Sequence, residues 1–256
     1  LSGTQNLVIA GGVESMSQVP IGASIIDGFK AEHGVPYGKK LSGRYPGVRF
    51  DQFAGAEMLA RKYELTQEEL NAFALDSHVK AKRAVQEGRF KNEIVPIEIE
   101  LEDGSRELHI QDEGIRMEAT LGAIAGLQPL QENGLLTAAN ASQICDGAAA
   151  VMIANGATCK RLGLKPLARI VAMRVIGSDP VIMLEGPIPA TRKVLEKAGL
   201  KLEDIDLFEV NEAFGSVPLA WAKALGADLH KLNVNGGAQA LGHPLGGTGA
   251  KLMTTL

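Results

Sequence analysis

Cysteine is scarce in this sequence, which has only Cys145 and Cys159 among its 256 residues. Two cysteines are too few for the disulfide framework of a small secreted domain, and their spacing matches no common zinc-binding pattern. Apolar runs are short as well, and none is long enough to cross a membrane. We therefore expect an intracellular protein, most simply in the reducing cytoplasm, with no membrane span.

An excess of charge of one sign is also missing. Lysine and arginine total 26 against 30 aspartates and glutamates, which gives a formal net charge of −4. Without a strongly basic surface, nucleic acid is not an expected partner, and an anionic ligand needs cations placed locally. Hydrophobic residues make up 45% of the chain, enough for a sizeable core in one large domain or two smaller ones.

Metal-binding motifs are absent, since no His-x-x-x-His or Cys-x-x-Cys spacing occurs. We therefore predict no metal site. Four of the five histidines have no chemical partners nearby in the sequence, and we interpret them as surface or core residues: His33, His78, His109 and His230. The fifth, His243, lies in a glycine-rich segment.

The chain starts at Leu1 rather than at a methionine, and it runs almost directly into a strand-like segment. It stops at Leu256, inside a predicted helix. The ends of natural proteins rarely lie inside elements that need packing partners. We therefore expect the chain to be a fragment at both ends.

The first half of the sequence is predicted to be rich in loops. Its clearest element is a helix over residues 66–87, where Thr66 and Glu69 form a capping box and apolar residues recur at helical spacing. The other predictions for this half are a buried strand over residues 7–10 with a tight turn at 11–12, a strand over 94–101, and irregular structure over 20–50 and 102–147.

Strands and helices alternate in the second half. The predicted strands cover residues 148–154, 168–176, 205–210 and 232–235. The predicted helices cover residues 187–198 and 213–225, and another begins near 247. This alternation predicts an α/β fold with a largely parallel sheet. A domain boundary is expected at about residues 160–165.

The glycine-rich stretch 233–249 follows a predicted strand, and in parallel α/β sheets ligands bind at the carboxyl ends of strands. His243 lies between Gly242 and Pro244, and a histidine in so constrained a place can take a proton near neutral pH. One alternative is a plain glycine-rich turn with an exposed histidine. Another is a phosphate-binding loop, although the glycine-lysine signature of a P-loop is absent.

Two other segments carry candidate chemistry. Asn211 lies where a predicted strand meets a helix, so its amide could donate to a developing oxyanion or simply cap the helix. Glu212 is interpreted as support for the helix N-terminus through the helix dipole. In residues 136–150, small side chains could admit a long, flat ligand and Ser142 could donate to it; close backbone packing around a turn is the alternative.

Together these segments resemble the thiolase family. The matching motifs are Gly-Gly-Val-Glu-Ser-Met-Ser at 11–17, Asp-Glu-Gly-Ile-Arg at 112–116, Thr-Ala-Ala-Asn-Ala-Ser at 137–142, Asp-Gly-Ala-Ala-Ala at 146–150, Gly-Pro-Ile-Pro-Ala at 186–190, Asn-Glu-Ala-Phe at 211–214, and Gly-Gly-Ala with Gly-His-Pro-Leu-Gly between 236 and 246. They occur in the family's order and cover essentially the whole chain.

The resemblance implies an α/β fold, the thiolase-like layered αβαβα arrangement with an inserted loop domain, incomplete at both ends here. Residues 1–160 would be the end of the N-terminal half. The inserted loop domain would lie at about residues 20–125. Residues 164–256 would form a truncated C-terminal half.

The resemblance also implies an acyltransferase that cleaves 3-oxoacyl-CoA to acetyl-CoA and a shortened acyl-CoA, or runs the reverse condensation, through an acyl-cysteine. His243 would deprotonate the cysteine, and Asn211 would hold a water in the oxyanion hole. Coenzyme A would be a substrate, with no covalently bound cofactor, and the assembly a homodimer or homotetramer. The residues implied to bind coenzyme A or the acyl chain are Arg116, Ser142, Phe214, Ala138 and Gly242.

The reactive cysteines of the family are expected outside this chain. The family's nucleophile precedes the segment that matches residues 11–17, and its second cysteine lies in a Cys-x-Gly motif after the last predicted helix. Cys145 and Cys159 match neither place, and we interpret them as structural residues. We therefore expect the isolated chain to be inactive.

The sequence leaves alternatives for the activity. Residues 50–57 replace a His-Met-Gly segment typical of biosynthetic acetoacetyl-CoA thiolases, which favours a degradative, β-oxidation-type enzyme of fatty acid metabolism. A related 3-oxoacyl synthase fits the motifs at 211–214 and 242–246 less well. From another class, the chain could be a non-catalytic thiolase-like protein that binds acyl-CoA or a partner subunit.

Overall fold

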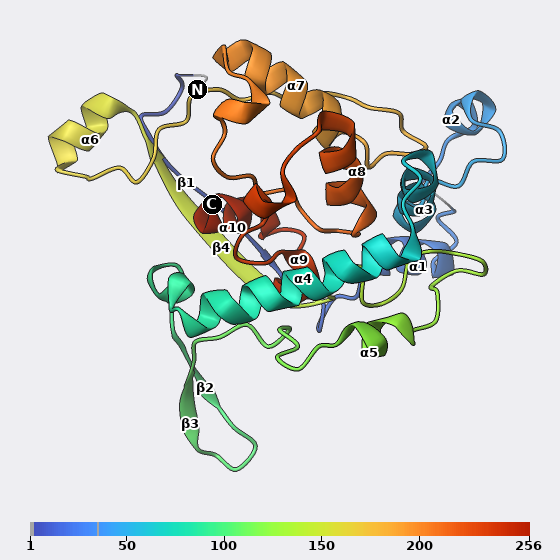
Figure 1. The fold of residues 1–256 in the computed structure, drawn as a ribbon, viewed down its shortest axis with the longest axis horizontal. Coiled ribbons are helices and arrows are strands. Elements are labelled where there is room, and N and C mark those ends of the chain that lie inside the picture. The colour runs from blue at the N-terminus through green and yellow to red at the C-terminus, as the bar shows by residue number, and fades with distance from the viewer. Residues whose placement is uncertain (1–2, 35) are drawn as a thin grey trace.

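A computed structural model describes residues 3–34 and 36–256 (Figure 1). Residues 1, 2 and 35 lie outside this description, and with them the expected start of the chain at Leu1. The elements in chain order are β1 (Leu7–Glu14), α1 (Ala23–Lys30), α2 (Lys39–Arg44), α3 (Gln52–Lys62), α4 (Gln67–Gln86), η1 (Arg89–Asn92), β2 (Ile97–Glu100), β3 (Arg106–His109), α5 (Leu121–Ala125), β4 (Gly147–Ala154), α6 (Gly156–Leu162), α7 (Pro187–Ala198), η2 (Leu202–Asp204), α8 (Ser216–Leu225), η3 (Leu229–Lys231), α9 (Ala238–Leu241) and α10 (Thr248–Thr255), where η marks a 3₁₀ helix.

The two longest strands, β1 and β4, form an antiparallel pair that crosses Figure 1 diagonally. Their residues pair one to one along the whole length of both strands. Helix α10 packs on both strands. The loop before α10 comes so close that a Cβ at Gly12 would lie 1.8 Å from the carbonyl oxygen of Gly246, so only glycine fits there. The strand pair therefore fixes the loop that carries His243.

Helix α4 lies across the molecule in Figure 1 and contributes much of the core. The Thr66 hydroxyl accepts from the backbone N–H of Glu69 at 3.2 Å, and the Glu69 carboxylate accepts from the backbone N–H of Thr66 at 2.8 Å. This reciprocal pair is the predicted capping box, and the predicted helix over 66–87 is confirmed. The buried face of α4 packs against α5 and α9 and comprises Leu70, Asn71, Phe73, Ala74, Ser77, His78, Ala81 and Ala84.

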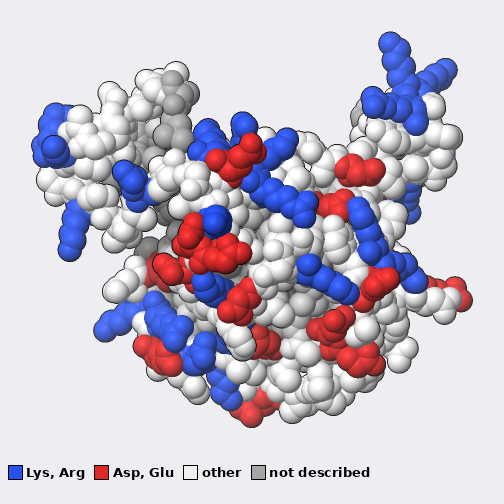
Figure 2. Space-filling view, turned by 45° about the horizontal axis from the view of Figure 1, so that its top comes forward, with Lys and Arg blue, Asp and Glu red and all other residues white. Residues whose placement is uncertain are grey.

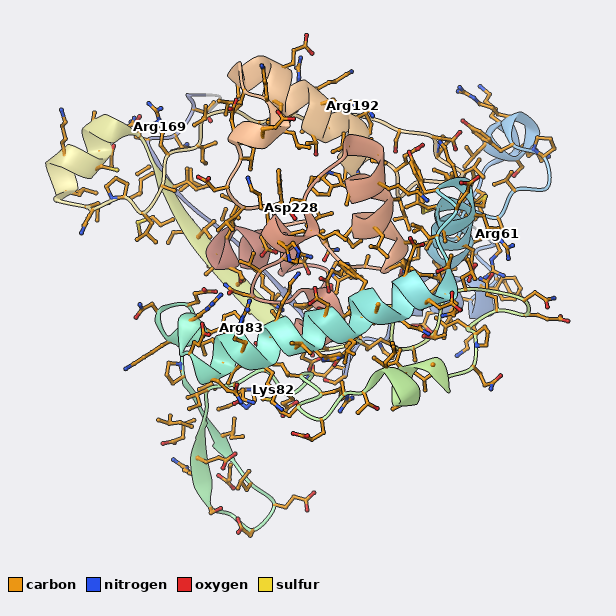
Figure 3. All side chains as sticks on the ribbon, viewed as in Figure 1. Arg61, Lys82, Arg83, Arg169, Arg192 and Asp228 are labelled. Carbon is orange, nitrogen blue, oxygen red and sulfur yellow. The ribbon has the colours of Figure 1, made fainter. Side chains whose placement is uncertain are left out.

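Trp221 of α8 is fully buried and belongs to an apolar cluster with residues of α3, α4 and α7. Its ring meets that of Phe208 edge-on, with centroids 5.0 Å apart. Helix α7, which has the predicted bounds 187–198, packs on α8, and Arg192 (Figure 3) donates to the carbonyl of Ala224 at 3.0 Å. Through Phe208 this cluster holds the segment that leads into the candidate site.

The surface carries charges of both signs. On the face in Figure 2, lysines and arginines alternate with aspartates and glutamates over the body of the molecule. The hairpin of β2 and β3 projects away from that body in Figure 1. Across residues 3–34 and 36–256, no helix combines the length and the apolar character that a membrane span needs.

The predicted parallel sheet is wrong for the described residues. Their sheets are both two-stranded and antiparallel, β1 with β4 and β2 with β3. The parallel contact between Phe208 and Leu232 is an isolated bridge. The strands predicted at 168–176, 205–210 and 232–235 are therefore not formed as strands, because a strand needs a continuous hydrogen-bonded ladder with a neighbouring chain.

Strand β1 also differs from its prediction. It does not turn at Gly11 and Gly12 but continues to Glu14, because both glycines stay in the ladder with β4. It is exposed along one face rather than buried. The strands predicted near 94–101 and 148–154 and the helix near 247 are confirmed as β2, β4 and α10. Further differences are α1 and α2 within 20–50, β3 and α5 within 102–147, α9 within the glycine-rich stretch 233–249, and a start of α8 at Ser216 instead of 213.

Candidate active site

His243 lies in the loop between α9 and α10, and neighbouring backbone holds it there. Gly242, directly before it, has a φ of 77°, in the left-handed region that favours glycine. A Cβ at Gly242 would also lie 2.5 Å from the sulfur of Cys145. The backbone N–H of His243 donates to the carbonyl of Gln143 at 3.3 Å. The backbone of the histidine is therefore constrained from the residue before it and from the chain beside it.

Both nitrogens of the His243 ring have polar neighbours. Nε2 lies 3.3 Å from Nδ2 of Asn211, and Nδ1 lies 2.7 Å from the hydroxyl of Thr248. Burial lowers the pKa of His243, and the positive charge of Lys251 lowers that pKa further. The imidazole is therefore neutral at pH 7, and a neutral imidazole can accept a proton as a general base does.

Lys251 is a largely buried cation close behind the histidine loop. Its ammonium, on α10, donates to the carbonyls of Leu241 and Gly242 at 2.5 and 3.3 Å. Burial lowers the pKa of Lys251, and the carboxylate of Asp112 opposes that shift. The ammonium anchors the C-terminal end of α9 and disfavours a second positive charge on His243.

Asn211 follows a stretch of backbone that is fixed by Asn233. The Val210 N–H donates to Oδ1 of Asn233, and Nδ2 of Asn233 donates to the Val210 carbonyl, both at 2.9 Å. The alternative in which Asn211 caps a helix is wrong, since α8 begins later, at Ser216. Oδ1 of Asn211 is buried and has no hydrogen-bond partner among the described residues. It is therefore an unused acceptor close to the His243 ring.

We had expected Glu212 to support the N-terminus of a helix, but it does not. It is 1% exposed, and its carboxylate accepts hydrogen bonds from the Ser77 hydroxyl at 2.7 Å, the Asn233 amide at 2.8 Å and the backbone N–H of Gln239 at 3.1 Å. Burial raises the pKa of Glu212, and these hydrogen bonds oppose the rise. The predicted role at a helix N-terminus is wrong because the Glu212 side chain turns inward. There it connects α4 to Asn233 and to α9.

A cavity of about 270 Å³ borders Asn211. Glu209, Arg174, Thr191 and Trp221 also line it. Burial raises the pKa of Glu209 to about 8, and the negative charge of Glu212 adds to the shift. Glu209 is therefore protonated at pH 7, so this wall of the cavity carries no negative charge.

A larger cavity of about 700 Å³ takes in two of the predicted binding residues, Arg116 and Ala138. A volume of this size suits a small organic ligand, and the exposed guanidinium of Arg116 places a cation at it. The other lining residues are His78, Ile115, Met117, Glu118, Ala119, Thr120, Ala123, Ile124, Leu127, Ala139, Gln143 and Gln239.

The loop that carries Arg116 is anchored on α4. Lys82, labelled in Figure 3, donates to the carbonyl of Met117 at 2.7 Å and lies 3.2 Å from the carboxylate of Glu118. The backbone N–H of Arg116 donates to Nδ1 of His78 at 3.1 Å. Burial lowers the pKa of His78, and the charge of Arg116 lowers it further. His78 is therefore a buried histidine, as one of our interpretations had it, and it also lines the larger cavity.

Gln143 connects the larger cavity to His243. Its side-chain amide donates to the carbonyl of Gly114 at 2.8 Å and to that of Gln239 at 2.7 Å. The backbone carbonyl of Gln143 accepts a hydrogen bond from the backbone N–H of His243. The wall of the cavity and the histidine loop are thus held in one hydrogen-bonded frame.

Three predicted binding residues do not line the larger cavity: Ser142, Phe214 and Gly242. Phe214 is 2% exposed and packs edge-on against Phe53, with ring centroids 5.1 Å apart. The backbone N–H of Ser142 donates to the carbonyl of Ala213 at 3.0 Å, which ties its segment to the one that carries Phe214. The structure therefore separates the predicted residues into a pair at the imidazole, a pair at the larger cavity, and three residues outside that cavity.

Thr248, Lys251 and Gln143 also belong to the surroundings of His243, although no sequence motif had indicated them. The first two follow His243 closely, and a helix that starts after a tight turn brings both back to the ring. That spacing was visible in the sequence, whereas the contacts of Gln143 come from distant segments. Over the residues that the structure describes, no three His, Cys, Asp or Glu side chains form a group that could hold a metal ion.

Known proteins similar to this chain are thiolases. Residues 1–157 match the thiolase N-terminal domain, and residues 164–256 match the thiolase C-terminal domain. A steroid 3-ketoacyl-CoA thiolase of Mycobacterium tuberculosis is 48% identical over 258 residues, which cover 100% of this chain and 62% of that protein. An acetyl-CoA acetyltransferase of Rhizobium meliloti is 44% identical, over 100% of this chain and 65% of its own length.

The fold is similar as well. The crystal structure of human mitochondrial 3-ketoacyl-CoA thiolase matches with a TM-score of 0.83 and 40% identity, covering 98% of this chain and 64% of that one. The chain thus spans less than two thirds of the length of each of these proteins. The match confirms the predicted α/β fold of the thiolase type. By its sequence and by its fold, the chain belongs to the thiolase family.

Proposed function

We propose that the protein catalyses thiolase-type acyl transfer: thiolytic cleavage of a 3-oxoacyl-CoA to acetyl-CoA and a shortened acyl-CoA, or the reverse condensation. The observation that carries this proposal is the 3.3 Å approach of Asn211 Nδ2 to His243 Nε2. A neutral imidazole beside an amide donor can take a proton from a nucleophile and then help to bind a thioester oxygen.

In the cleavage direction, His243 removes the proton from a cysteine thiol, and the thiolate attacks the 3-oxo carbon of the substrate. The bond between C2 and C3 breaks, the acyl group stays on the sulfur, and the acetyl-CoA carbanion takes a proton from a second cysteine and leaves. The second cysteine, now a thiolate, takes the proton of the coenzyme A thiol. The coenzyme A thiolate attacks the acyl-cysteine and forms the shortened acyl-CoA, while the departing cysteine thiolate recovers its proton from His243. Asn211 holds a water or donates to the oxyanion at the carbonyl.

Coenzyme A is a substrate in this proposal, and the larger cavity is its binding site. Arg116 supplies the cation for a phosphate-bearing ligand, and the small side chain of Ala138 leaves room for a long, narrow one. Ser142, Phe214 and Gly242 lie outside this cavity, and their proposed contacts are with other parts of the ligand. Ser142 is proposed to donate to an amide or carbonyl, Phe214 to contact the acyl chain, and Gly242 to lie beside the ligand next to the imidazole.

The direction and the substrate class are proposed from the relatives and from one departure in the sequence. The relatives carry the names 3-ketoacyl-CoA thiolase and acetyl-CoA acetyltransferase. Residues 50–57 lack the His-Met-Gly segment typical of biosynthetic acetoacetyl-CoA thiolases. This favours a degradative enzyme of the β-oxidation type that acts on a range of 3-oxoacyl chains.

Thiolysis by the protein expressed from the complete open reading frame tests the proposal. With a 3-oxoacyl-CoA and coenzyme A, we expect acetyl-CoA and the shortened acyl-CoA in equal amounts by chromatography, and nearly complete loss of activity in His243→Ala. A series of chain lengths tests the substrate class, and a strict preference for the four-carbon substrate contradicts the degradative direction. No coenzyme-A-dependent cleavage of any chain length contradicts the activity itself.

The chain of 256 residues on its own is proposed to be inactive, because neither of its cysteines is suited to be the nucleophile. Burial raises the pKa of the Cys145 thiol, and the positive charge of Lys251 opposes that shift only in part. Cys159 lies on α6, in a different part of the fold. Thiolysis by the isolated chain above a heat-inactivated control contradicts this point.

Residues 1–160 and 164–256 are proposed as two halves, with the loop domain at about 20–125. Self-association to a dimer or tetramer is proposed because one face of the β1–β4 pair is apolar and exposed. A cytoplasmic location is proposed because the two cysteines are free thiols, as in reducing compartments.

A further inference from the structure

The hydroxyl of Thr248 lies between the ring of His243 and the backbone carbonyl of Pro244, and it has a different hydrogen-bond role toward each. It is 2.7 Å from Nδ1 of His243, and it donates to the carbonyl of Pro244 at 2.9 Å. A threonine hydroxyl has one hydrogen to donate, and its oxygen can also accept. A backbone carbonyl can only accept, so the contact with Pro244 uses that hydrogen.

The proton count then fixes the state of Nδ1. Since the Thr248 hydrogen points to Pro244, the short contact with the ring is made by the hydroxyl oxygen as acceptor. An acceptor at 2.7 Å from Nδ1 of His243 requires a hydrogen on that nitrogen. In a neutral imidazole the other nitrogen, Nε2, then carries a lone pair.

The opposite edge of the ring leads to the same assignment. Nε2 of His243 lies 3.3 Å from Nδ2 of Asn211, and an amide nitrogen donates but does not accept. With the Asn211 amide oriented as in the structure, Nδ2 toward the ring, Nε2 accepts, which it does only without a hydrogen. The two edges have different partners on different segments, and both assign the same tautomer.

We propose that Thr248 is a positioning residue that holds His243 as the Nδ1–H tautomer and so directs the Nε2 lone pair toward Asn211. The inference deepens the proposed function, because the base of that reaction is the Nε2 lone pair. The tautomer itself can be measured without any turnover.

The surroundings of Thr248 keep its hydroxyl in place. The residue is 7% exposed and is the first of α10. The Pro244 carbonyl also accepts from the backbone N–H groups of Gly247 and Thr248, at 2.8 and 2.9 Å. A branched Cβ restricts the side-chain rotamer of threonine. The hydroxyl therefore meets the ring with little freedom to turn away, which is what a residue that sets a tautomer requires.

NMR of the 256-residue chain with ring-¹⁵N-labelled histidine tests the tautomer directly. The chain has five histidines, and the signal that disappears in His243→Asn identifies the one of interest. We expect the wild-type ring, at a pH where it is neutral, to show a protonated Nδ1 and an unprotonated Nε2. A protonated Nε2 in the wild type overturns the proposal.

Variants of Thr248 separate its role from general packing. Thr248→Val removes the hydroxyl but keeps the shape, and we expect a mixture of both tautomers; Thr248→Ala serves as a second variant in case the valine disturbs folding. Thr248→Ser keeps the hydroxyl and should restore the wild-type spectrum. The matched control is Thr254→Val on the same helix, since Thr254 makes the same type of bond, to the Ala250 carbonyl at 2.9 Å, away from the ring.

An unchanged tautomer in the folded Thr248→Val or Thr248→Ala variant overturns the role of Thr248. In the protein from the complete reading frame, we expect Thr248→Val to lower kcat for thiolysis about five- to tenfold with little change in KM, and Thr248→Ser to recover it. If Thr248→Val shifts the tautomer but leaves kcat unchanged, the positioning role of Thr248 in the reaction is also contradicted. If that protein shows no thiolysis while the spectra follow the expected pattern, only the proposed function fails.

Discussion

At the scale of single residues, the charge on Lys251 should control the basicity of His243. The pKa of the imidazole is lowered first by burial and then by this ammonium. In Lys251→Met the repulsion disappears, so we expect the pKa of His243 to rise toward the ordinary value while burial still holds it below that value. A pH titration of the ¹⁵N-labelled ring measures the change.

The control for this prediction is Lys223→Met. Lys223 also donates to two carbonyls, those of Tyr63 and Glu64 at 2.7 and 3.4 Å, but it lies outside the surroundings that shift His243. We expect no change in the histidine titration in this variant. An equal rise in both lysine variants, or a fall in Lys251→Met, means that the ammonium does not act on the ring through its charge.

Glu209 should make the stability of the protein depend on pH. Its pKa in the folded protein is raised from the ordinary 4.5 to about 8, by burial and by the charge of Glu212. Because the folded state holds the proton more tightly, stability is complete below the unfolded pKa and is lost as the pH rises through the folded one. Wild-type stability should therefore fall between about pH 4.5 and 8, by up to about 1.4 kcal/mol per unit of pH.

Urea unfolding at pH 5 and pH 8 measures this effect. Glu209→Gln imitates the protonated carboxyl, so we expect the variant to be more stable than the wild type at pH 8 and similar to it at pH 5. Glu203→Gln, at an exposed site nearby in the sequence, should follow the wild type at both pH values. A parallel pH dependence in Glu209→Gln and in the wild type contradicts the assignment.

The residues of the imidazole pair could be predicted from the sequence because their motifs carry chemistry in their own composition. His243 among glycines and Asn211 in Asn-Glu-Ala-Phe were both named from the sequence, and the structure places them 3.3 Å apart. Glu212 was misinterpreted because its partners come from α4 and α9, far away in the chain. Sequence patterns describe neighbours along the chain, and a buried hydrogen-bond network depends on neighbours in space.

At the scale of elements, the packing of β1 against the loop before α10 should be sensitive to one methyl group. A Cβ at Gly12 would lie 1.8 Å from the backbone oxygen of Gly246, and backbone cannot move aside cheaply. We expect Gly12→Ala to lower the free energy of unfolding by about 2 kcal/mol or more and to displace the His243 loop. Unfolding curves and the His243 ring spectrum report the two effects.

Gly249→Ala is the control for this substitution. Gly249 lies within α10, and a Cβ there would meet nothing within 4 Å. Alanine in a helix is favoured over glycine, so we expect a gain of about 0.5–1 kcal/mol and an unchanged His243 spectrum. If Gly12→Ala is as harmless as Gly249→Ala, the strand pair does not position the loop as the structure indicates.

Helices were predicted better than strands, and the reason lies in what each element needs. Helix α7 was predicted with its observed bounds, and α4 to within a residue at each end, because caps and apolar spacing are written in the local sequence. Residues 168–176 have the composition of a strand but no neighbouring ladder in the described structure. Strand pairing is a property of two segments, so the sequence of one cannot establish it.

At the scale of the whole molecule, the family could be predicted from the sequence because its motifs lie along the entire chain. The exposure of a strand could not be predicted in this way, because it depends on which other elements cover that strand. Ile9 and Val13 of β1 are each 71% exposed, and Met152 of β4 is 59% exposed. Ile9 pairs with Met152 in the ladder, so both point to the same face of the strand pair. This face is apolar and uncovered, although β1 was predicted to be buried.

Such a face should drive self-association, since removing apolar area from water is favourable and uncovered apolar patches commonly mark interfaces. We expect the sedimentation coefficient of the chain to rise with concentration and Ile9→Lys to weaken the association markedly. Ile97→Lys makes the same change on the projecting hairpin, at a side chain that is 59% exposed, and should leave the association as in the wild type. A chain that remains monomeric over a wide range of concentration, or an Ile9→Lys variant that associates like the wild type, rules out this face as the contact.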